Sequence, residues 1–133
     1  MKTTRRPGGR YEYTFTWLMR RSFILSYDPA RRVLSFKNLF PNVTARSPIA
    51  TALREVVAER STNRVPAHKR LDGRRVQASC GIRGGGFWLT MRVRGEQGAY
   101  AVQQLLGLVN ELFLVLHETF PDYVAAEFGL SSE

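Results

Sequence analysis

The sequence predicts an α+β domain with the element order β-β-β-α-β-β-α, in which two helices pack on one face of a five-stranded antiparallel sheet. Two patterns support this fold class. Five short segments alternate apolar and polar residues, as half-buried strands do, and two segments repeat apolar residues at helical spacing. With 133 residues, the chain is long enough for one domain with its own core. We expect a flexible basic arm at residues 1–10 and a single domain at residues 11–133.

The first three strands are expected to form a meander of antiparallel neighbours. They are predicted at residues 11–18, 22–27 and 32–37. In the first strand an aromatic row alternates with polar residues, and we interpret this row as core rather than as a stacking surface. The row consists of Tyr11, Tyr13, Phe15 and Trp17. Asp28 and Pro29 predict a type I turn between the second and third strands, and residues 38–46 are expected to form a connecting loop.

The first helix is predicted at residues 48–60. Ser47 is a favourable N-cap, and Pro48 suits the first helical position. The apolar face of this helix would consist of Ile49, Leu53, Val56 and Val57. A long polar loop should follow at residues 61–75, because this stretch has neither a helical nor a strand period.

Two further strands, at residues 75–82 and 86–93, flank a glycine-rich turn and predict a hairpin. One face of this hairpin is apolar and should lie in the core. Its residues are Val76, Ala78, Cys80, Ile82, Phe87, Leu89, Met91 and Val93. Trp88, Arg92 and Arg94 are out of phase with this row, so we expect them on the opposite, open face of the sheet.

The longest helix is predicted at residues 99–120, and Pro121 should break or re-aim it before one or two further turns. The apolar arc of this helix is wider than one sheet layer requires. Either the first helix and the C-terminal turns cover the excess, or a second copy of the chain does. On the second alternative we predict a homodimer interface made by Leu105, Leu108, Val109, Leu112, Val115 and Leu116.

Charge is distributed unevenly along the chain. The net charge is +9, yet residues 1–95 carry +15 and residues 96–133 carry −6. Such an asymmetry indicates an anionic partner. We predict a nucleic-acid-binding surface that combines a basic loop with the open face of the hairpin, where a tryptophan would stack a base. Its residues are Arg64, Lys69, Arg70, Arg74, Arg75, Arg83, Trp88, Arg92 and Arg94. The alternative for the loop is a solvated connector without a binding role.

The sequence holds no constellation that is typical of an enzyme, a metal site or a cofactor site. His68 and His117 are far apart, and the single cysteine, Cys80, lies in an apolar row that favours a structural thiol. The glycines at 84–86 stand between two strands, so they predict a turn rather than a phosphate cradle. We therefore expect no catalytic residue, no metal and no cofactor. No export signal and no long uninterrupted apolar run is visible, which predicts a cytoplasmic protein without a membrane span.

Two functions remain open from the sequence. The first is a small non-enzymatic module that binds RNA or DNA through basic loops and the open sheet face. The alternative is a dimeric adaptor or secretion-chaperone-like module that binds a protein partner, with the basic surface matching acidic segments. In layout alone, the element order resembles that of dimeric secretion chaperones, which would imply pairing of two chains and a protein partner. Binding through phosphates should weaken steeply with salt, whereas an adaptor should respond little to nucleic acid.

Overall fold

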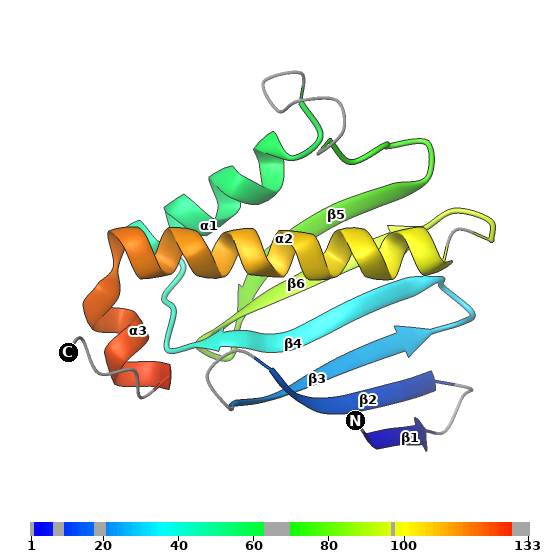
Figure 1. The fold of residues 1–133 in the computed structure, drawn as a ribbon, viewed down its shortest axis with the longest axis horizontal. Coiled ribbons are helices and arrows are strands. Elements are labelled where there is room, and N and C mark those ends of the chain that lie inside the picture. Colours follow the sequence, from blue (N-terminus) through cyan, green and yellow to red (C-terminus); the bar gives the residue numbers. More distant parts are fainter. Residues whose placement is uncertain (1, 7–9, 18–20, 63–69, 97, 129–133) are drawn as a thin grey trace.

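The computed structural model describes residues 2–6, 10–17, 21–62, 70–96 and 98–128, with side chains from residue 24 onward. It confirms an α+β fold with an open antiparallel sheet (Figure 1). The strands are β1 (Lys2–Arg6), β2 (Arg10–Trp17), β3 (Arg21–Asp28), β4 (Val33–Pro41), β5 (Val76–Arg83) and β6 (Gly86–Val93). The helices are α1 (Pro48–Glu59), α2 (Gly98–Thr119) and α3 (Pro121–Phe128). The strand order is β1-β2-β3-β4-β6-β5, and every neighbouring pair is antiparallel.

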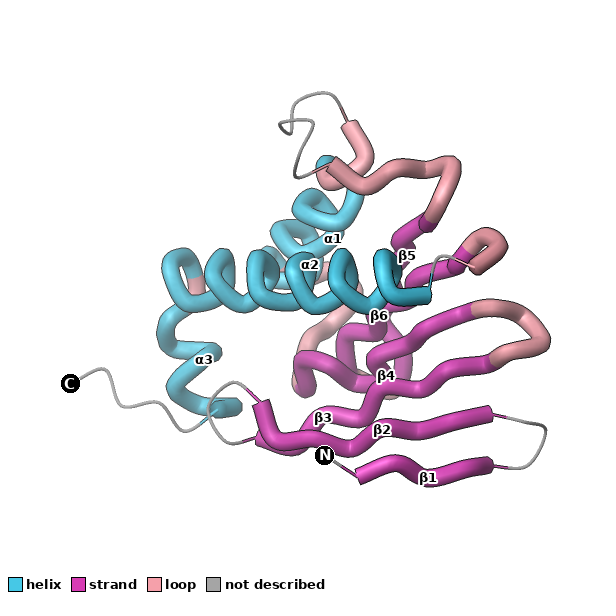
Figure 2. The backbone as a smooth tube through the Cα atoms, turned by 45° about the vertical axis from the view of Figure 1, so that its right-hand side comes forward, coloured by secondary structure: helices cyan, strands magenta, loops and turns pink. Residues whose placement is uncertain are grey.

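Both long helices lie on one face of the sheet, as the sequence predicts. Figure 1 shows α2 crossing in front of the β5–β6 half of the sheet with α1 beside it, whereas β1, β2 and β3 extend beyond the helices. The tube view in Figure 2 shows the same two layers after a turn of 45°. No described helix covers the opposite face of the sheet.

The number of elements differs from the predicted five strands and two helices. The additional strand, β1, lies within the segment predicted as a flexible arm, and it pairs with β2 from Lys2↔Thr14 to Arg6↔Arg10. Its sequence has no apolar alternation, so a search for hydrophobic period misses a strand that is defined by backbone pairing. The additional helix, α3, begins at Pro121, because proline is well suited to the first helical position and here re-aims the chain.

The predicted loop at residues 38–46 is wrong in its first part, because β4 continues to Pro41. The register with β6 shifts between Phe36 and Phe40, which marks a β-bulge. Asn38 has a φ of 51° in this bulge, a left-handed conformation that asparagine tolerates better than most residues. Because of the bulge, the consecutive residues Leu39 and Phe40 are both buried in the core. The sequence therefore lacks the apolar–polar alternation of a strand at this point and predicts a loop.

The predicted turns and helix cap are confirmed. The Ser47 side chain accepts a hydrogen bond from the Ala50 backbone N–H at 3.1 Å and caps α1. The Asp28 carboxylate accepts hydrogen bonds from the backbone N–H groups of Ala30 and Arg31 in the β3–β4 turn, at 3.1 and 3.3 Å. Gly84 and Gly85 both have positive φ, 57° and 76°, as the two central residues of a tight hairpin turn require.

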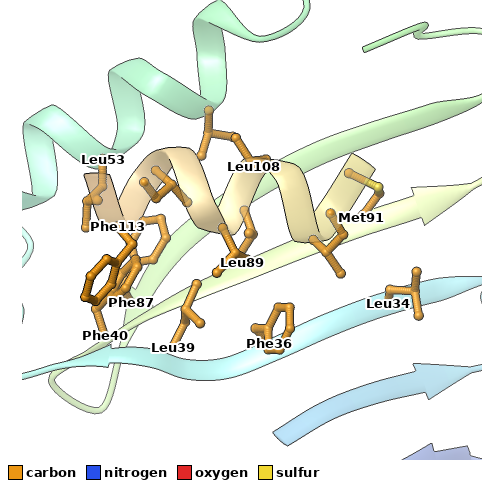
Figure 3. Close-up of a cluster of buried hydrophobic side chains, with 14 of the residues drawn as sticks. Leu34, Phe36, Leu39, Phe40, Leu53, Phe87, Leu89, Met91, Leu108 and Phe113 are labelled. Carbon is orange, nitrogen blue, oxygen red and sulfur yellow. The ribbon is translucent and has the colours of Figure 1, made fainter. Parts of the chain in front are cut away.

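The core lies between the helices and the β4–β6–β5 half of the sheet (Figure 3). All four inward residues predicted on β6 are buried: Phe87, Leu89, Met91 and Val93. On β5, Val76 is buried, whereas the rest of the predicted apolar row is only half-buried. The reason is that β5 is the edge strand, so it has a covering neighbour on one side only. The aromatic row predicted on β2 lies outside the described side chains.

Most of the apolar arc of α2 is covered within one chain by the sheet, α1 and α3, whereas Val102 and Leu114 stay exposed. Five of the six residues predicted at a dimer interface are therefore fully buried core residues: Leu105, Leu108, Val109, Leu112 and Leu116. Val115 is half-buried. A second copy cannot reach these five side chains in the folded chain, so the predicted interface is corrected at those positions and stays a prediction at Val115. Self-association itself stays a prediction, now without an assigned surface.

By length and composition, α2 is the one helix in the described part of the chain that is apolar enough to cross a membrane. Its apolar side forms the centre of the core, and its other side exposes Gln103, Asn110 and Glu118. Such a division is typical of an amphipathic helix that packs on a sheet, although Val102 and Leu114 are exposed as well.

Candidate nucleic-acid interface

The open face is the side of the β4–β6–β5 sheet that points away from α1 and α2. Its residues alternate with the buried row and comprise Ser35, Lys37, Gln77, Ser79, Arg83, Trp88, Thr90 and Arg92. None of these three strands contains an aspartate or glutamate. Strand alternation therefore separates an apolar inner face from an outer face on which every charge is positive.

Trp88 lies half-buried at one end of the open face, flanked by two cations. The Lys37 Nζ is 5.9 Å from the centroid of the indole ring, and the Arg83 Cζ is 5.1 Å from it. Both distances are within the range at which the ring quadrupole attracts a cation. Lys37 comes from β4 and Arg83 from the end of β5, the two strands that pair with β6 on either side. The sheet therefore builds an aromatic surface with positive charge on two sides.

A row of hydroxyl groups crosses the sheet next to Trp88. Ser35 pairs with Thr90 between β4 and β6, and Thr90 pairs with Ser79 between β6 and β5. The Ser79 and Thr90 hydroxyl oxygens lie 2.5 Å apart and share a hydrogen bond. Ser26 on β3 continues the row opposite Ser35, but its Oγ is buried and has no hydrogen-bond partner among the described side chains. The hydroxyls of Ser35, Thr90 and Ser79 can both donate and accept, as contacts to sugar and phosphate oxygens require.

An open hollow of about 520 Å³ lies at the β5 edge of the open face. It is lined by Val33, Ser61, Gly73, Gln77, Ala78, Ser79, Thr90 and Arg92. The one charged residue of this lining is Arg92, which lies between Val33 and Gln77 in the sheet register. The hollow therefore brings a guanidinium group together with an amide and three hydroxyls, a set of groups that suits a phosphate.

Arginines from three parts of the sequence meet where β6 ends. The Val93 N–H donates to the Arg32 carbonyl at 2.8 Å, and the Arg94 N–H donates to the Arg75 carbonyl at 2.9 Å. The β3–β4 turn and the segment before β5 therefore flank the end of β6. Arg92 and Arg94 are exposed, and within residues 24–62, 70–96 and 98–128 no acidic side chain pairs with them or with Arg32. This gathering of positive charge was not evident from sequence spacing.

The basic loop contributes less than the sequence suggests. Arg64 and Lys69 lie outside the described residues, so their predicted roles are untested. Arg70 is half-buried and engaged in an interaction of its own. Of the nine residues predicted for nucleic-acid binding, the structure brings Arg83 and Trp88 together, whereas the described loop members Arg70, Arg74 and Arg75 make local contacts.

Those local contacts centre on Asp72 and Tyr100. The Arg74 Nε lies 3.2 Å from the Asp72 Oδ1, and the Asp72 carboxylate also accepts the Arg74 backbone N–H at 2.9 Å. The side-chain hydrogen bond from Arg74 lowers the pKa of Asp72 and raises that of Arg74. The Arg75 guanidinium lies 3.6 Å from the centroid of the Tyr100 ring. The Arg74 side chain stays 91% exposed while it makes this ion pair, whereas the Arg75 guanidinium lies over an aromatic ring.

Lys37 was missed by sequence reasoning, although it is one of the two cations beside Trp88. The predicted strand ends at this residue. The bulge that follows interrupts the apolar–polar alternation, so the rest of β4 is predicted as a loop. The signal was present nonetheless, because Lys37 directly follows the buried Phe36 and so must point to the open face.

Cys80 is a free thiol that is half-buried on the helix side of β5. Burial raises its pKa, which disfavours the reactive thiolate. Across the described part of the chain, no three side chains of the His, Cys, Asp and Glu types cluster as a metal site would require. The groups with evident binding chemistry are thus those of the open face.

Comparison of the chain with protein families, curated proteins and solved structures gives no match. The geometry of the open face is therefore the basis for a functional proposal.

Proposed function

We propose that this protein is a non-enzymatic module that binds RNA or DNA through the open face of its sheet. The observation that carries the proposal is Trp88, which lies between Lys37 and Arg83 on strands without acidic residues. A base can stack on the indole while its neighbouring phosphates meet the two cations. Stacking accepts every base, because every base has a π-face, so this binding would depend little on sequence.

The polar groups around Trp88 support the same proposal. The row of Ser35, Thr90 and Ser79 offers hydroxyl groups that can bind the sugar–phosphate backbone of a nucleic acid stacked on Trp88. Arg92 and Arg94 extend the positive charge toward the end of β6. The basic loop plays a smaller part in this proposal, since Arg74 and Arg75 already have partners. We further propose a cytoplasmic location, where Cys80 would remain a free thiol.

The test is fluorescence anisotropy of a labelled single-stranded oligonucleotide, titrated with protein at several salt concentrations. Each phosphate that a lysine or arginine neutralises contributes about 0.7 to the logarithmic salt slope on single strands. The double substitution Lys37→Gln and Arg83→Gln should therefore lower the slope by about 1.4 and weaken binding. Arg46→Gln is the matched control, because Arg46 is an exposed arginine in the loop before α1. If the wild type does not bind at low salt, the proposal fails.

The alternative is a protein partner with an acidic segment. Tryptophan and arginine are also the residues that dominate protein interfaces, so the cluster around Trp88 would serve such a partner too. In that case a folded or peptide ligand would bind, while nucleic acid would neither bind at low salt nor compete. The anisotropy experiment therefore decides between the two functions.

A further inference from the structure

Two binding features of the open face lie on one strand. Trp88 and Arg92 are four residues apart on β6 and point to the same side of the sheet, with Thr90 between them. Since an antiparallel strand rises about 3.4 Å per residue, the two positions are about 14 Å apart. Trp88 offers a stacking surface, whereas Arg92 offers a guanidinium group at the mouth of a hollow lined by hydroxyl and amide groups.

We infer that the ligand is a single strand that lies along β6, with a base on Trp88 and a phosphate in the hollow beside Arg92. This inference rests on the proposed function and adds the form and the path of the nucleic acid. The hydroxyls of Thr90 and Ser79 lie between the two contacts, where they meet the sugar–phosphate backbone.

The stacking surface selects a single strand over a duplex. A base within a duplex has both of its faces covered by neighbours, so the indole of Trp88 has no partner there without unstacking. Reading a duplex through its major groove usually requires a helix or a ribbon that enters the groove. The helices α1 and α2 lie on the other side of the sheet, so neither can enter a groove from the open face (Figure 1).

The charges favour a path along β6 rather than across the sheet. Along the strand, Lys37 and Arg83 flank one end, and Arg92 and Arg94 mark the other. Across the sheet, β3 offers no cation among its described open-face side chains, which are Ile24, Ser26 and Asp28. A polyanion that crossed toward β3 would move away from the cations that lie along β6. The path along β6 therefore has the better electrostatic complementarity.

The test compares a labelled oligothymidylate of about 12 nucleotides with its duplex on oligoadenylate. The single strand should bind at least tenfold more tightly, and Trp88→Ala should remove about tenfold of that affinity while leaving duplex binding unchanged. Arg92→Gln should lower the single-strand salt slope by about 0.7, whereas the control Arg46→Gln should not change it. Circular dichroism would verify that each variant is folded.

The failures of the inference and of the proposed function are distinguishable. If neither form binds at low salt, the proposed function is wrong. If the duplex binds as tightly as the single strand, or Trp88→Ala weakens both forms equally, nucleic acid binds but not as a single strand on Trp88. If Arg92→Gln leaves the salt slope unchanged, the single strand does not follow β6 to the hollow.

Discussion

The two faces of β6 show how one strand separates stability from binding. The inward residues Phe87, Leu89 and Met91 are fully buried against the helices (Figure 3). The outward residues Trp88 and Arg92 alternate with them and retain exposure, and Trp88 lies beside the cations of Lys37 and Arg83. The backbone pairing with β4 and β5 is the same for both rows. Packing therefore determines the inward row, whereas the outward row is free to serve a ligand.

This difference predicts that substitutions on the two faces have separate consequences. An inward substitution should destabilise the fold, because a rigid core leaves a cavity when a large side chain is truncated. An outward substitution should leave the fold intact and change only the binding of an anionic partner. Each prediction below tests this separation, and the expected effects decrease from one to the next.

Phe87→Ala should give the largest effect. The Phe87 ring is fully buried and stacks on Phe40 with a centroid distance of 5.8 Å. Its removal should lower the free energy of unfolding by about 3–5 kcal/mol, whereas Trp88→Ala should lower it by about 1 kcal/mol or less. Chemical denaturation of both variants measures the two values. Equal losses would show that Trp88 belongs to the core and would break the comparison.

Gly86→Ala tests the close approach of Gly86 to Asn38 in the bulge that follows Lys37. A Cβ at position 86 would overlap the Asn38 side chain, so alanine should lower the free energy of unfolding by about 1–3 kcal/mol. Asn38→Gly removes that side chain and still permits the φ of 51°. The double variant should therefore be more stable than the sum of the two single effects predicts. Strict additivity in denaturation would argue against this contact.

Charge removal on the open face should change binding but not stability. Replacement of Lys37, Arg83 and Arg92 by glutamine should lower the single-strand salt slope by about 2, if each side chain neutralises one phosphate. The matching loop variant, with Lys69, Arg70, Arg74 and Arg75 replaced by glutamine, should lower the slope by less. The reason is that Arg74 and Arg75 are engaged with Asp72 and Tyr100. If the loop variant lowered the salt slope more than the open-face variant, the loop rather than the sheet would be the main site of phosphate contact.

Asp72→Asn should have the smallest effect, and it should depend on pH. The hydrogen bond from Arg74 lowers the pKa of Asp72, so the carboxylate stabilises the fold above the ordinary aspartate pKa. That contribution is lost as the pH falls through the lowered pKa of the folded state. The difference in unfolding free energy between wild type and Asp72→Asn should thus be greatest near neutral pH and vanish in acid. A difference that grows on acidification would contradict the assigned ion pair.

Sequence patterns predicted most of the fold, because amphipathic elements encode their buried face in their own period. That period predicts the helices α1 and α2, the β5–β6 hairpin and the position of Trp88 on the outer face of β6. The edge strand β1 could not be found this way, since its residues carry no apolar alternation. The arc of α2 was ambiguous for a different reason. A sequence shows that Leu105 and Leu112 are buried, but not whether a helix of the same chain or another copy buries them.

The candidate site was predictable only where its residues share an element. Trp88 and Arg92 share β6, so their common face follows from spacing alone. The meeting of Lys37 with Trp88 depends on the pairing of β4 with β6, and the approach of Arg32 and Arg75 to the end of β6 depends on where three segments end. Such contacts are properties of topology, and spacing in the sequence does not report them.

The most direct test of the central claim is the fluorescence of Trp88 itself. The chain has two tryptophans, so Trp17→Phe would leave Trp88 as the sole source of tryptophan fluorescence. Added single-stranded oligonucleotide should quench this emission saturably, with the same midpoint as the anisotropy titration, and salt should restore it because the phosphate contacts are electrostatic. If anisotropy reports binding while the Trp88 emission stays unchanged, the nucleic acid binds elsewhere and the open face is not its site.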